Sequence, residues 1–365
     1  MNATILGIVG VLVLIGMIFL GTNIGFAMAA VGFVGFALFT DIPTAFSLFR
    51  TVPFTNAASY SLSVIPLFIL MGQFAHHSGI SHGLFDACER FLGRTKGGLC
   101  AAAVATSAGF SAICGSAPAT AATMATLALP AMRRRSYDDS LSTGCIAAGG
   151  TPGILIPPST PFIVYGGIFS GFFTANEAAG VGAFVAMLFM APKKKLTFKN
   201  VYRALYESVK ITAMIYIIFI GAYIFGYFLT ITMIPITMAN FVASLNVPPL
   251  VVMLIILAIY VVLGCIMDAM AMVLLTVPIF LPIIEMLQLD PVWFGVVIVL
   301  VMQIGMMTPP VGMNVYVLAG IARDVPMHKI FKGVVPFVIA AVIVVVIVLL
   351  VPELSLWLPN LIFNK

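Results

Sequence analysis

The sequence predicts an all-α polytopic membrane protein, and three observations support this prediction. Hydrophobic residues make up 62% of the 365 residues and charged residues only 8%, whereas soluble domains carry about a quarter charged residues. The apolar runs are continuous rather than alternating, which predicts helices and argues against an outer-membrane barrel. At roughly 20 residues per crossing, these runs provide about ten or more spanning or re-entrant segments. A soluble enzyme, a DNA-binding protein and a disulfide scaffold are excluded.

The N-terminal region is expected to contain several helices. Residues 4–40 hold two apolar helices, and a third is expected at about 61–75. No basic segment precedes the first apolar run, so we interpret it as a retained helix rather than a cleaved signal. Residues 78–96 place apolar side chains at helical spacing with Arg90 and Arg94 on the polar side. This pattern predicts an amphipathic helix along the cytoplasmic interface.

Residues 97–132 form an apolar stretch with basic residues on both sides, at 90–96 and at 133–135. Because basic residues mark the cytoplasmic side of a membrane protein, both ends should face the cytoplasm. The centre of the stretch, CGSAPAT at 114–120, is small and polar, which is typical of a hairpin tip buried in protein. We interpret the stretch as a re-entrant hairpin, although two tight full crossings satisfy the same charge rule.

The next crossing, residues 141–166, cannot be one continuous helix. It contains paired glycines and four prolines within CIAAGGTPGILIPPSTPFIVYGG. Proline removes a backbone donor and clashes with the preceding turn, so carbonyl groups are freed at membrane depth. We therefore predict a broken helix here. The following run, 168–190, ends at the basic cluster 193–195 and returns the chain to the cytoplasm.

The second half of the chain has the opposite charge pattern. No Lys or Arg occurs between Lys210 and Arg323, so the loops of this segment are expected on the periplasmic side. The elements predicted here are a crossing at 211–230, an amphipathic connection, a hairpin-length run at 250–287 centred on GCIMDAM, an interrupted helix at 292–321 and a last helix at 333–351.

These features form an internal repeat, because a hairpin followed by a proline-broken helix occurs twice. ILIPPSTPFIVYGG aligns with MMTPPVGMNVYVLAG when Pro157-Pro158 is superimposed on Pro309-Pro310. The first hairpin has basic flanks and the second has none, so the two copies should be inverted across the membrane. Inverted repeats with broken helices are typical of secondary transporters that bind their substrate near the midplane. A channel, a membrane enzyme and a pure assembly scaffold fit these features less well.

Several polar residues in the apolar stretches are candidates for binding substrate. Asp268 is the one acidic residue deep in such a stretch, and an intramembrane charge is a functional hypothesis by default. A helix-capping role for Asp268 is the alternative. The other expected substrate-site residues are Ser116, Thr120, Ser159, Thr160, Pro310 and Asn314. For the five polar residues among these six, the alternative role is to satisfy nearby backbone groups. Because no arginine is buried, helix N-termini would have to attract an anionic substrate.

At these residues the sequence resembles the DctM-like permeases, the large membrane subunits of the tripartite ATP-independent periplasmic (TRAP) transporters. The resemblance covers nearly the whole chain and is carried by SVIPLFILMGQ (63–73), GFSAICGSAPATAATM (109–124), GGTPGILIPPS (149–159), GIFSGFFTANEAA (167–179), GCIMDAMAMVLLTVP (264–278) and GMMTPPVGMNVYVLAGI (305–321). The family normally has a further helix, a cytoplasmic loop and the start of another helix after the IPPS motif. In this chain Gly166 and Gly167 are adjacent, and the loss of two crossings would preserve the sidedness of the downstream helices.

The resemblance implies an elevator-type carrier similar to the ion transporter superfamily, in the bacterial inner membrane. It implies coupling to Na⁺, a small four-helix membrane subunit (Q type) and a periplasmic substrate-binding protein (P type) as partners, and an organic anion such as sialic acid or a C4-dicarboxylate as substrate. A stand-alone sodium/carboxylate symporter of the same superfamily is the alternative. Carried over from the family's hairpin tips and broken helices, the expected sodium ligands are Cys114, Ala117, Gly153, Ile156 and Pro158 in the first half-site, and Gly264, Gly305, Thr308 and Val311 in the second.

The domain organisation expected from these features alternates between a static and a mobile part. The static scaffold comprises the first helices and the interfacial arm (1–90), further helices (167–249) and a C-terminal helix (333–365). The mobile part comprises the first hairpin and broken helix (91–166) and the second hairpin and broken helix (250–332).

Overall fold

The structure is a computed structural model that describes residues 3–114, 117–152, 174–244, 247–265, 267 and 269–363. The described residues form helices and no strand. The helices are α1 (Ala3–Phe19), α2 (Ile24–Phe39), α3 (Ile42–Ala57), the 3₁₀ turn η1 (Tyr60–Ser63), α4 (Val64–Ser78), α5 (Ile80–Leu92), α6 (Gly98–Cys114), α7 (Ala117–Arg134), α8 (Asp139–Gly149), α10 (Ala175–Leu188), α11 (Phe198–Ile231), α12 (Ile234–Ser244), α13 (Pro249–Gly264), α14 (Ala269–Met286), α15 (Pro291–Gly305), α16 (Met313–Ile321), α17 (Met327–Leu350) and α18 (Glu353–Phe363).

The N-terminal helices agree with the sequence, with one addition. The two predicted helices in 4–40 are α1 and α2, and the Asn23 side chain caps α2 by accepting the Gly25 N–H at 3.0 Å. The helix α3 was not predicted. Its start is fixed by Asp41, which accepts the Thr44 N–H at 3.2 Å, as an N-cap residue does. The amphipathic arm is α5, a helix as expected.

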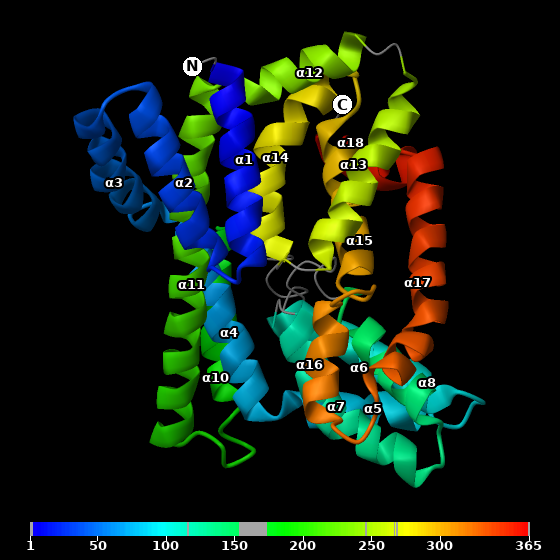
Figure 1. Cartoon of the computed structure of the whole chain (residues 1–365). Helices are drawn as coiled ribbons and strands as arrows, with labels where there is room; N and C mark the ends of the chain where they lie inside the picture. Colours follow the sequence, from blue (N-terminus) through cyan, green and yellow to red (C-terminus); the bar gives the residue numbers. More distant parts are fainter. Residues whose placement is uncertain are drawn as a thin grey trace.

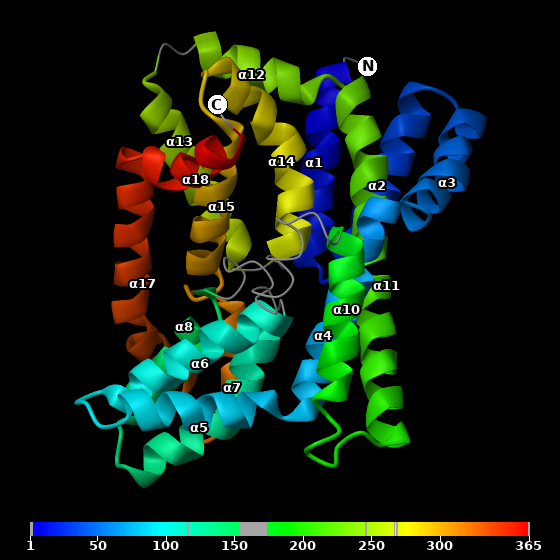
Figure 2. The ribbon, with the colours of Figure 1, turned by 180° about the vertical axis from the view of Figure 1, so that it is seen from behind.

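The two predicted hairpins are helix pairs of opposite orientation. The pair α6/α7 rises from the lower end of the molecule in Figure 1, and the pair α13/α14 descends from the upper end. The two pairs therefore approach each other at mid-height, as the view from behind also shows (Figure 2). The second broken helix is also present, because α15 ends at Gly305 and α16 begins only at Met313. In the first, α8 ends at Gly149, and residues 153–173 lie outside the described part.

The charge pattern agrees with this arrangement. The connections α7–α8, α10–α11 and α16–α17 lie at the lower end in Figure 1 and contain Arg135, Lys193–Lys195 and Arg323. The end of α12, the start of α13 and the α14–α15 connection lie at the upper end and belong to the segment without Lys or Arg. By the positive-inside rule the lower end is the expected cytoplasmic end. Among the described helices, α11 (34 residues) and α17 (24 residues) are long and apolar enough to cross a bilayer.

Glycines allow two pairs of helices to touch at their backbones. A Cβ atom added to Gly221 of α11 would lie 2.1 Å from the carbonyl oxygen of Gly25 in α2. A Cβ atom added to Gly333 of α17 would lie 1.8 Å from the carbonyl oxygen of Ser140 in α8, and one added to Gly144 would lie 2.2 Å from the Gly333 carbonyl carbon. Small residues at such crossings are typical of helix packing in membranes.

The buried apolar side chains form three clusters. One joins α1, α11 and α12 to the second hairpin and α15 in the upper half. Another joins the first hairpin and α8 to α16 and the start of α17 in the lower half. The smallest joins α4, α10 and the start of α11. The ends of the two hairpins lie between these clusters, where the described part of the chain leaves a cavity.

Candidate functional site

The second half-site is built on a contact between the ends of α13 and α15. Gly264 is the last residue of α13, and Gly305 is the last residue of α15. A Cβ atom added to Gly305 would lie 2.8 Å from the Gly264 Cα, so only glycine allows this approach. The structure thus brings together two of the residues expected to bind sodium.

Thr308 and Cys265 extend this contact beyond the helix ends. The Thr308 hydroxyl donates to the Ile304 carbonyl at 2.6 Å, and the Gly305 carbonyl accepts the Thr308 N–H at 3.1 Å. The Cys265 thiol lies 3.1 Å from the Val261 carbonyl and 3.3 Å from the Pro309 carbonyl, and either oxygen can accept its single proton. Because its single proton is engaged, the Thr308 oxygen has lone pairs available for a cation.

The chain between α15 and α16 is reversed by Gly312, whose φ of +55° is in the left-handed region that favours glycine. Within this segment Pro310 and Val311 are exposed. Asn314, in the first turn of α16, is fully buried, and its side-chain amide donates to the Ala147 carbonyl of α8 at 3.2 Å. Asn314 therefore ties the second broken helix to the first repeat instead of facing the cavity.

The first half-site is closed by α8 against the first hairpin. The Ser111 hydroxyl of α6 donates to the Gly150 carbonyl at 2.9 Å. A Cβ atom added to Gly150 would lie 2.9 Å from the carbonyl oxygen of Ala117, the first residue of α7. Ala117 and Thr120 are both fully buried. The two half-sites thus share a plan, in which a helix that ends in glycine closes on the tip of a hairpin.

Some of the expected site residues lie outside the described part of the chain. These are Gly153, Ile156 and Pro158 among the expected sodium ligands, and Ser116, Ser159, Thr160 and Asp268 among the expected substrate residues. Cys114 is described only as the end of α6. The described residues therefore place Ala117, Gly264, Gly305 and Thr308 near their partner helices.

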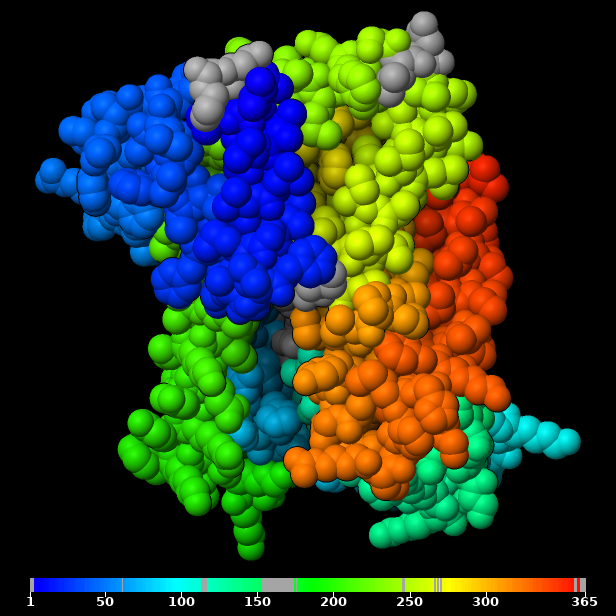
Figure 3. Space-filling view, in the orientation of Figure 1, coloured from blue at the N-terminus to red at the C-terminus, as the bar shows by residue number. Residues whose placement is uncertain are grey.

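A cavity of about 560 Å³ lies where the two hairpins face α4 and α11. This volume is within the range of about 300–1,000 Å³ that is typical of small-molecule sites. The surface is hollowed in the same region, between α11 and α16 with α4 behind (Figure 3). The helices α7 and α14 both begin at the cavity, because Ala117 to Ala119 and Ala269 line it. Two helix N-termini, which carry partial positive charge, therefore face one space.

The polar side chains of the cavity gather where α4 and α11 face α7. His76 Nδ1 lies 3.2 Å from the Thr123 hydroxyl, so a hydrogen bond joins α4 to the first hairpin. Glu207 of α11 pairs with His77 at 3.1 Å and with Arg203 at 3.5 Å. Gln73 lies one turn before His76 on α4 and also lines the cavity. No Lys or Arg is found among the described lining residues.

Sequence analysis did not identify this polar part of the cavity. Gln73 and His76 are spaced three residues apart, so they share a helix face with Ile69 and Gly72. Polar residues on one face of an otherwise apolar helix are the signal that could have identified them. The predicted helix ended at 75, whereas α4 continues to Ser78 and includes His76.

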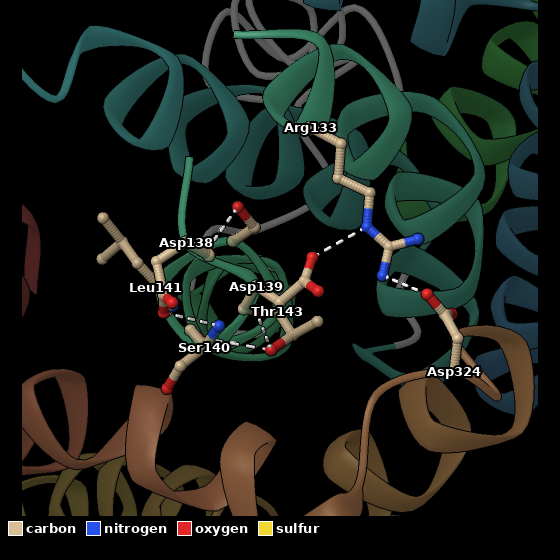
Figure 4. Close-up of polar contacts among 8 residues, drawn as sticks. Arg133, Asp138, Asp139, Ser140, Leu141, Thr143 and Asp324 are labelled. Carbon is tan, nitrogen blue, oxygen red and sulfur yellow. Dashed lines mark hydrogen bonds and ion pairs between the residues drawn. The ribbon is translucent and has the colours of Figure 1, made fainter. Parts of the chain in front are cut away.

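An ion-pair cluster, drawn in Figure 4, lies beside the α7–α8 and α16–α17 connections, which are at the lower end of the molecule in Figure 1. Arg133, at the end of α7, donates from Nε to Asp139 at 2.8 Å and places Nη2 2.6 Å from a carboxylate oxygen of Asp324. Asp138 caps α8 by accepting the Ser140 N–H at 2.8 Å. The Arg133 guanidinium lowers the pKa of the Asp324 carboxyl by hydrogen bonding to its charged form. The cluster joins the first hairpin, α8 and the loop after α16.

Two helix hairpins of opposite orientation that meet at a cavity in an all-helical, strongly apolar chain are typical of secondary transporters in membranes. Comparison with known proteins gives its family. The profile of the family described as tripartite ATP-independent periplasmic transporter, DctM component, matches residues 11–167 and 160–354. The chain therefore belongs to the DctM-like family of TRAP large permeases. The two matching segments meet at 160–167, where the family's additional helices were expected to be missing.

Individual relatives agree with this assignment. The C4-dicarboxylate TRAP transporter large permease DctM of Pseudomonas aeruginosa is 29% identical over 84% of this chain and 88% of the relative. The sialic acid TRAP transporter large permease SiaM of Vibrio cholerae is 27% identical over 95% of this chain and 97% of the relative. These relatives are permeases and not enzymes, as predicted for this chain.

A solved structure supports the fold. The YdaH transporter of Alcanivorax borkumensis superposes with a TM-score of 0.55, covering 85% of this chain and 88% of that one. At 14% sequence identity the likeness concerns the fold alone.

Proposed function

We propose that this chain is the transporting subunit of a sodium-coupled TRAP system in a bacterial inner membrane, where it takes up an organic anion delivered by a periplasmic binding protein. The observation that carries the proposal is the meeting of two inverted hairpins at one cavity, in a chain that belongs to a family of tripartite transporters. The names of relatives point to sialic acid or a C4-dicarboxylate as substrate.

The donor groups near the helix ends suit Na⁺. A hard cation prefers oxygen ligands, and carbonyl and hydroxyl oxygens supply them without a net charge. In the second half-site the Thr308 hydroxyl and the carbonyls around Gly264, Gly305 and Val311 would hold the ion. In the first, the carbonyls of Ala117 and Cys114 would do so with Gly153, Ile156 and Pro158. When bound, Na⁺ would neutralise charge that the anion brings into the cavity.

The substrate carboxylate would lie at the starts of α7 and α14, which line the cavity. A helix N-terminus attracts an anion through its partial positive charge and its unpaired N–H groups. Asp268, Ser116, Thr120, Ser159, Thr160, Pro310 and Asn314 are the proposed substrate-site residues. Because Asn314 is buried against α8, its contribution would be to position α16.

We propose an elevator mechanism for the transport cycle. The two hairpins, re-entrant from opposite sides of the membrane, and their broken helices would form a mobile domain of 91–166 and 250–332. The remaining segments, 1–90, 167–249 and 333–365, would form the scaffold. The hydrogen bond between His76 of α4 and Thr123 of α7 crosses this boundary, so it would break whenever the mobile domain moves.

The test is uptake into proteoliposomes that contain the full chain and its small membrane subunit, with a binding protein outside. We expect uptake of sialic acid or succinate only when an inward sodium gradient and the binding protein are both present. Equal uptake under a proton gradient without sodium would contradict sodium coupling. Uptake that persists without the binding protein would replace the tripartite mechanism with the stand-alone sodium/carboxylate symporter.

A further inference from the structure

We propose that the polar part of the cavity, formed by Gln73, His76, Thr123 and Glu207, is a second subsite that recognises hydroxyl and amide groups of the substrate. The transported anion would then be a hydroxylated monocarboxylate of the sugar-acid type rather than a dicarboxylate. This inference rests on the proposed function, because it assigns a substrate class to the same cavity.

The hydrogen bonds of Thr123 fix what His76 presents to the cavity. The Thr123 hydroxyl has one proton, and it donates that proton to the Ala119 carbonyl at 2.9 Å. The contact of 3.2 Å with His76 must then be made by the Nδ1–H of the imidazole. In the neutral ring this leaves Nε2 as a hydrogen-bond acceptor. The His76 side chain is exposed and lines the cavity, so a ligand can reach it.

Glu207 gives the same end of the cavity a second acceptor. An ionised carboxylate accepts hydrogen bonds and donates none. Its neighbours His77 and Arg203 approach it from outside the lining of the cavity. Together, His76 Nε2 and the Glu207 carboxylate suit the O–H and N–H donors of a sugar acid.

A second carboxylate would fit this end poorly. It would meet two hydrogen-bond acceptors, one of which, the Glu207 carboxylate, has the same charge, and such contacts are a common source of specificity against a wrong ligand. No described lining residue is Lys or Arg, and the sequence of 153–173 contains neither. A dicarboxylate would therefore have one carboxylate at the helix N-termini and the other without a cationic partner.

The length of the cavity agrees with a ligand that has two distinct ends. Its lining runs from Ala117 and Ala269 at the hairpin tips to Thr123 and His76 toward the lower end. On α7 alone, Ala117 and Thr123 are six residues apart, which is about 9 Å along a helix at 1.5 Å per residue. The lining also includes the apolar side chains of Phe110, Met214 and Met302.

The experiment is equilibrium binding to the purified full chain in lipid nanodiscs, with radiolabelled sialic acid as the monocarboxylate probe and succinate as the dicarboxylate competitor. For the wild type we expect sialic acid to bind at least about tenfold more tightly than succinate. In the Glu207→Gln variant we expect the ratio of the sialic acid affinity to the succinate affinity to fall by about tenfold, because succinate no longer meets a like charge. Arg203→Gln is the matched control, since it leaves the Glu207 carboxylate in place and should not narrow the preference.

His76→Phe tests the acceptor directly. It should weaken sialic acid binding by about three- to tenfold, the effect of one lost hydrogen bond, and leave succinate binding unchanged. The ratio of two affinities measured on one sample does not depend on how much of a variant is folded. Partial misfolding therefore cannot imitate these results.

Several outcomes would overturn the inference. Succinate binding as tightly as sialic acid, an unchanged ratio in Glu207→Gln, or binding of neither probe would each do so. The uptake assay separates this failure from failure of the proposed function. Sodium-driven uptake of succinate would contradict the sugar-acid subsite but agree with the proposed function. If no organic anion were taken up, both the subsite and the proposed function would be contradicted.

Discussion

The two hairpins are joined to their following helices in different ways. In the first repeat, a serine hydroxyl reaches from α6 to the Gly150 carbonyl at 2.9 Å. In the second, the backbones of Gly264 and Gly305 meet with no side chain between them, and a side-chain contact described beside them is the weaker one between the Cys265 thiol and the Pro309 carbonyl, at 3.3 Å. The outer ends differ as well. The base of the first hairpin carries the Arg133 ion pairs, whereas none of the ion pairs among the described residues involves α13, α14 or α15.

The difference follows from the side of the membrane on which each hairpin opens. The lower end is expected to be cytoplasmic and carries the basic residues, so ion pairs can form there. The upper hairpin lies in a segment without Lys or Arg and is held by packing and by uncharged contacts such as the hydrogen bond between Tyr260 and Thr276. Packing at the backbone leaves no room for adjustment, while a hydrogen bond or an exposed ion pair can be lost at moderate cost. Substitutions in the two repeats should therefore lower the stability of the protein by different amounts.

The largest effect is expected for Gly305→Ala. The new methyl group would lie 2.8 Å from the Gly264 Cα, and neither backbone can rotate away. We expect a destabilisation of about 1–3 kcal/mol and a strong loss of uptake. The measurement is thermal unfolding in nanodiscs together with proteoliposome uptake. Gly295→Ala in the same helix is the control, because nothing lies within 4 Å of the added atom. Equal behaviour of the two variants would contradict the backbone contact.

Ser111→Ala should have the next largest effect. It leaves the Gly150 carbonyl without the buried donor it has in the native chain, which costs about 1–2 kcal/mol. Ser107→Ala is the matched control on the same helix, since the Ser107 hydroxyl is buried without a hydrogen-bond partner. We expect this control to be neutral or slightly stabilising. A larger loss from Ser107→Ala than from Ser111→Ala, measured by thermal unfolding, would show that the hydrogen bond does not close the first repeat.

Arg133→Gln should have a smaller effect, because its two ion pairs are partly exposed. We expect the unfolding temperature to fall by roughly 2–4 °C or less, more at low salt than at high salt. Arg134→Gln is the control, since Arg134 forms none of the ion pairs in the described chain. If the difference between the two variants did not depend on salt, the cluster would not act through charge.

The smallest effect concerns pH. The folded-state pKa of Asp324 is lowered, chiefly by the hydrogen bond from Arg133. Its contribution to stability is thus fully present above the unfolded pKa of about 3.9 and is lost as the pH falls through the lower folded value. Asp324→Asn should therefore lower the unfolding temperature slightly at neutral pH, and this effect should shrink as the pH falls below about 3.9. If the difference in unfolding temperature between Asp324→Asn and the wild type grew as the pH fell, the prediction would be wrong.

The orientation of both hairpins could be predicted from sequence because it depends on charge. Basic clusters flank the first hairpin and are absent around the second, and this pattern alone indicated their opposite directions. The interruption between α15 and α16 was also predictable, since Pro309-Pro310 cannot continue a helix. These predictions depend on local composition and need no knowledge of distant contacts.

Other features could not be predicted, for physical reasons. The helix α3 contains Ser47, Arg50 and an internal proline, so its mean hydropathy is too low to indicate a membrane-spanning helix. Its start depends on capping by Asp41. The polar end of the cavity joins His76 and Thr123, which are 47 residues apart. Their meeting depends on how α4 packs on the first hairpin, which periodicity within one helix does not reveal.

The crossing of α8 and α17 has a consequence for how such a molecule can move. At Gly144 and Gly333 the two main chains touch directly, and the Ser140 hydroxyl also donates to the Lys329 carbonyl at 2.8 Å. Helices slide past each other most easily when a layer of side chains separates them, and at Gly144 and Gly333 no side chain lies between the two backbones. In the proposed elevator movement the start of α17, up to and including Gly333, would therefore move with α8, which shifts the proposed boundary between the mobile part and the scaffold past Gly333. Sliding would then take place where α4 meets the first hairpin.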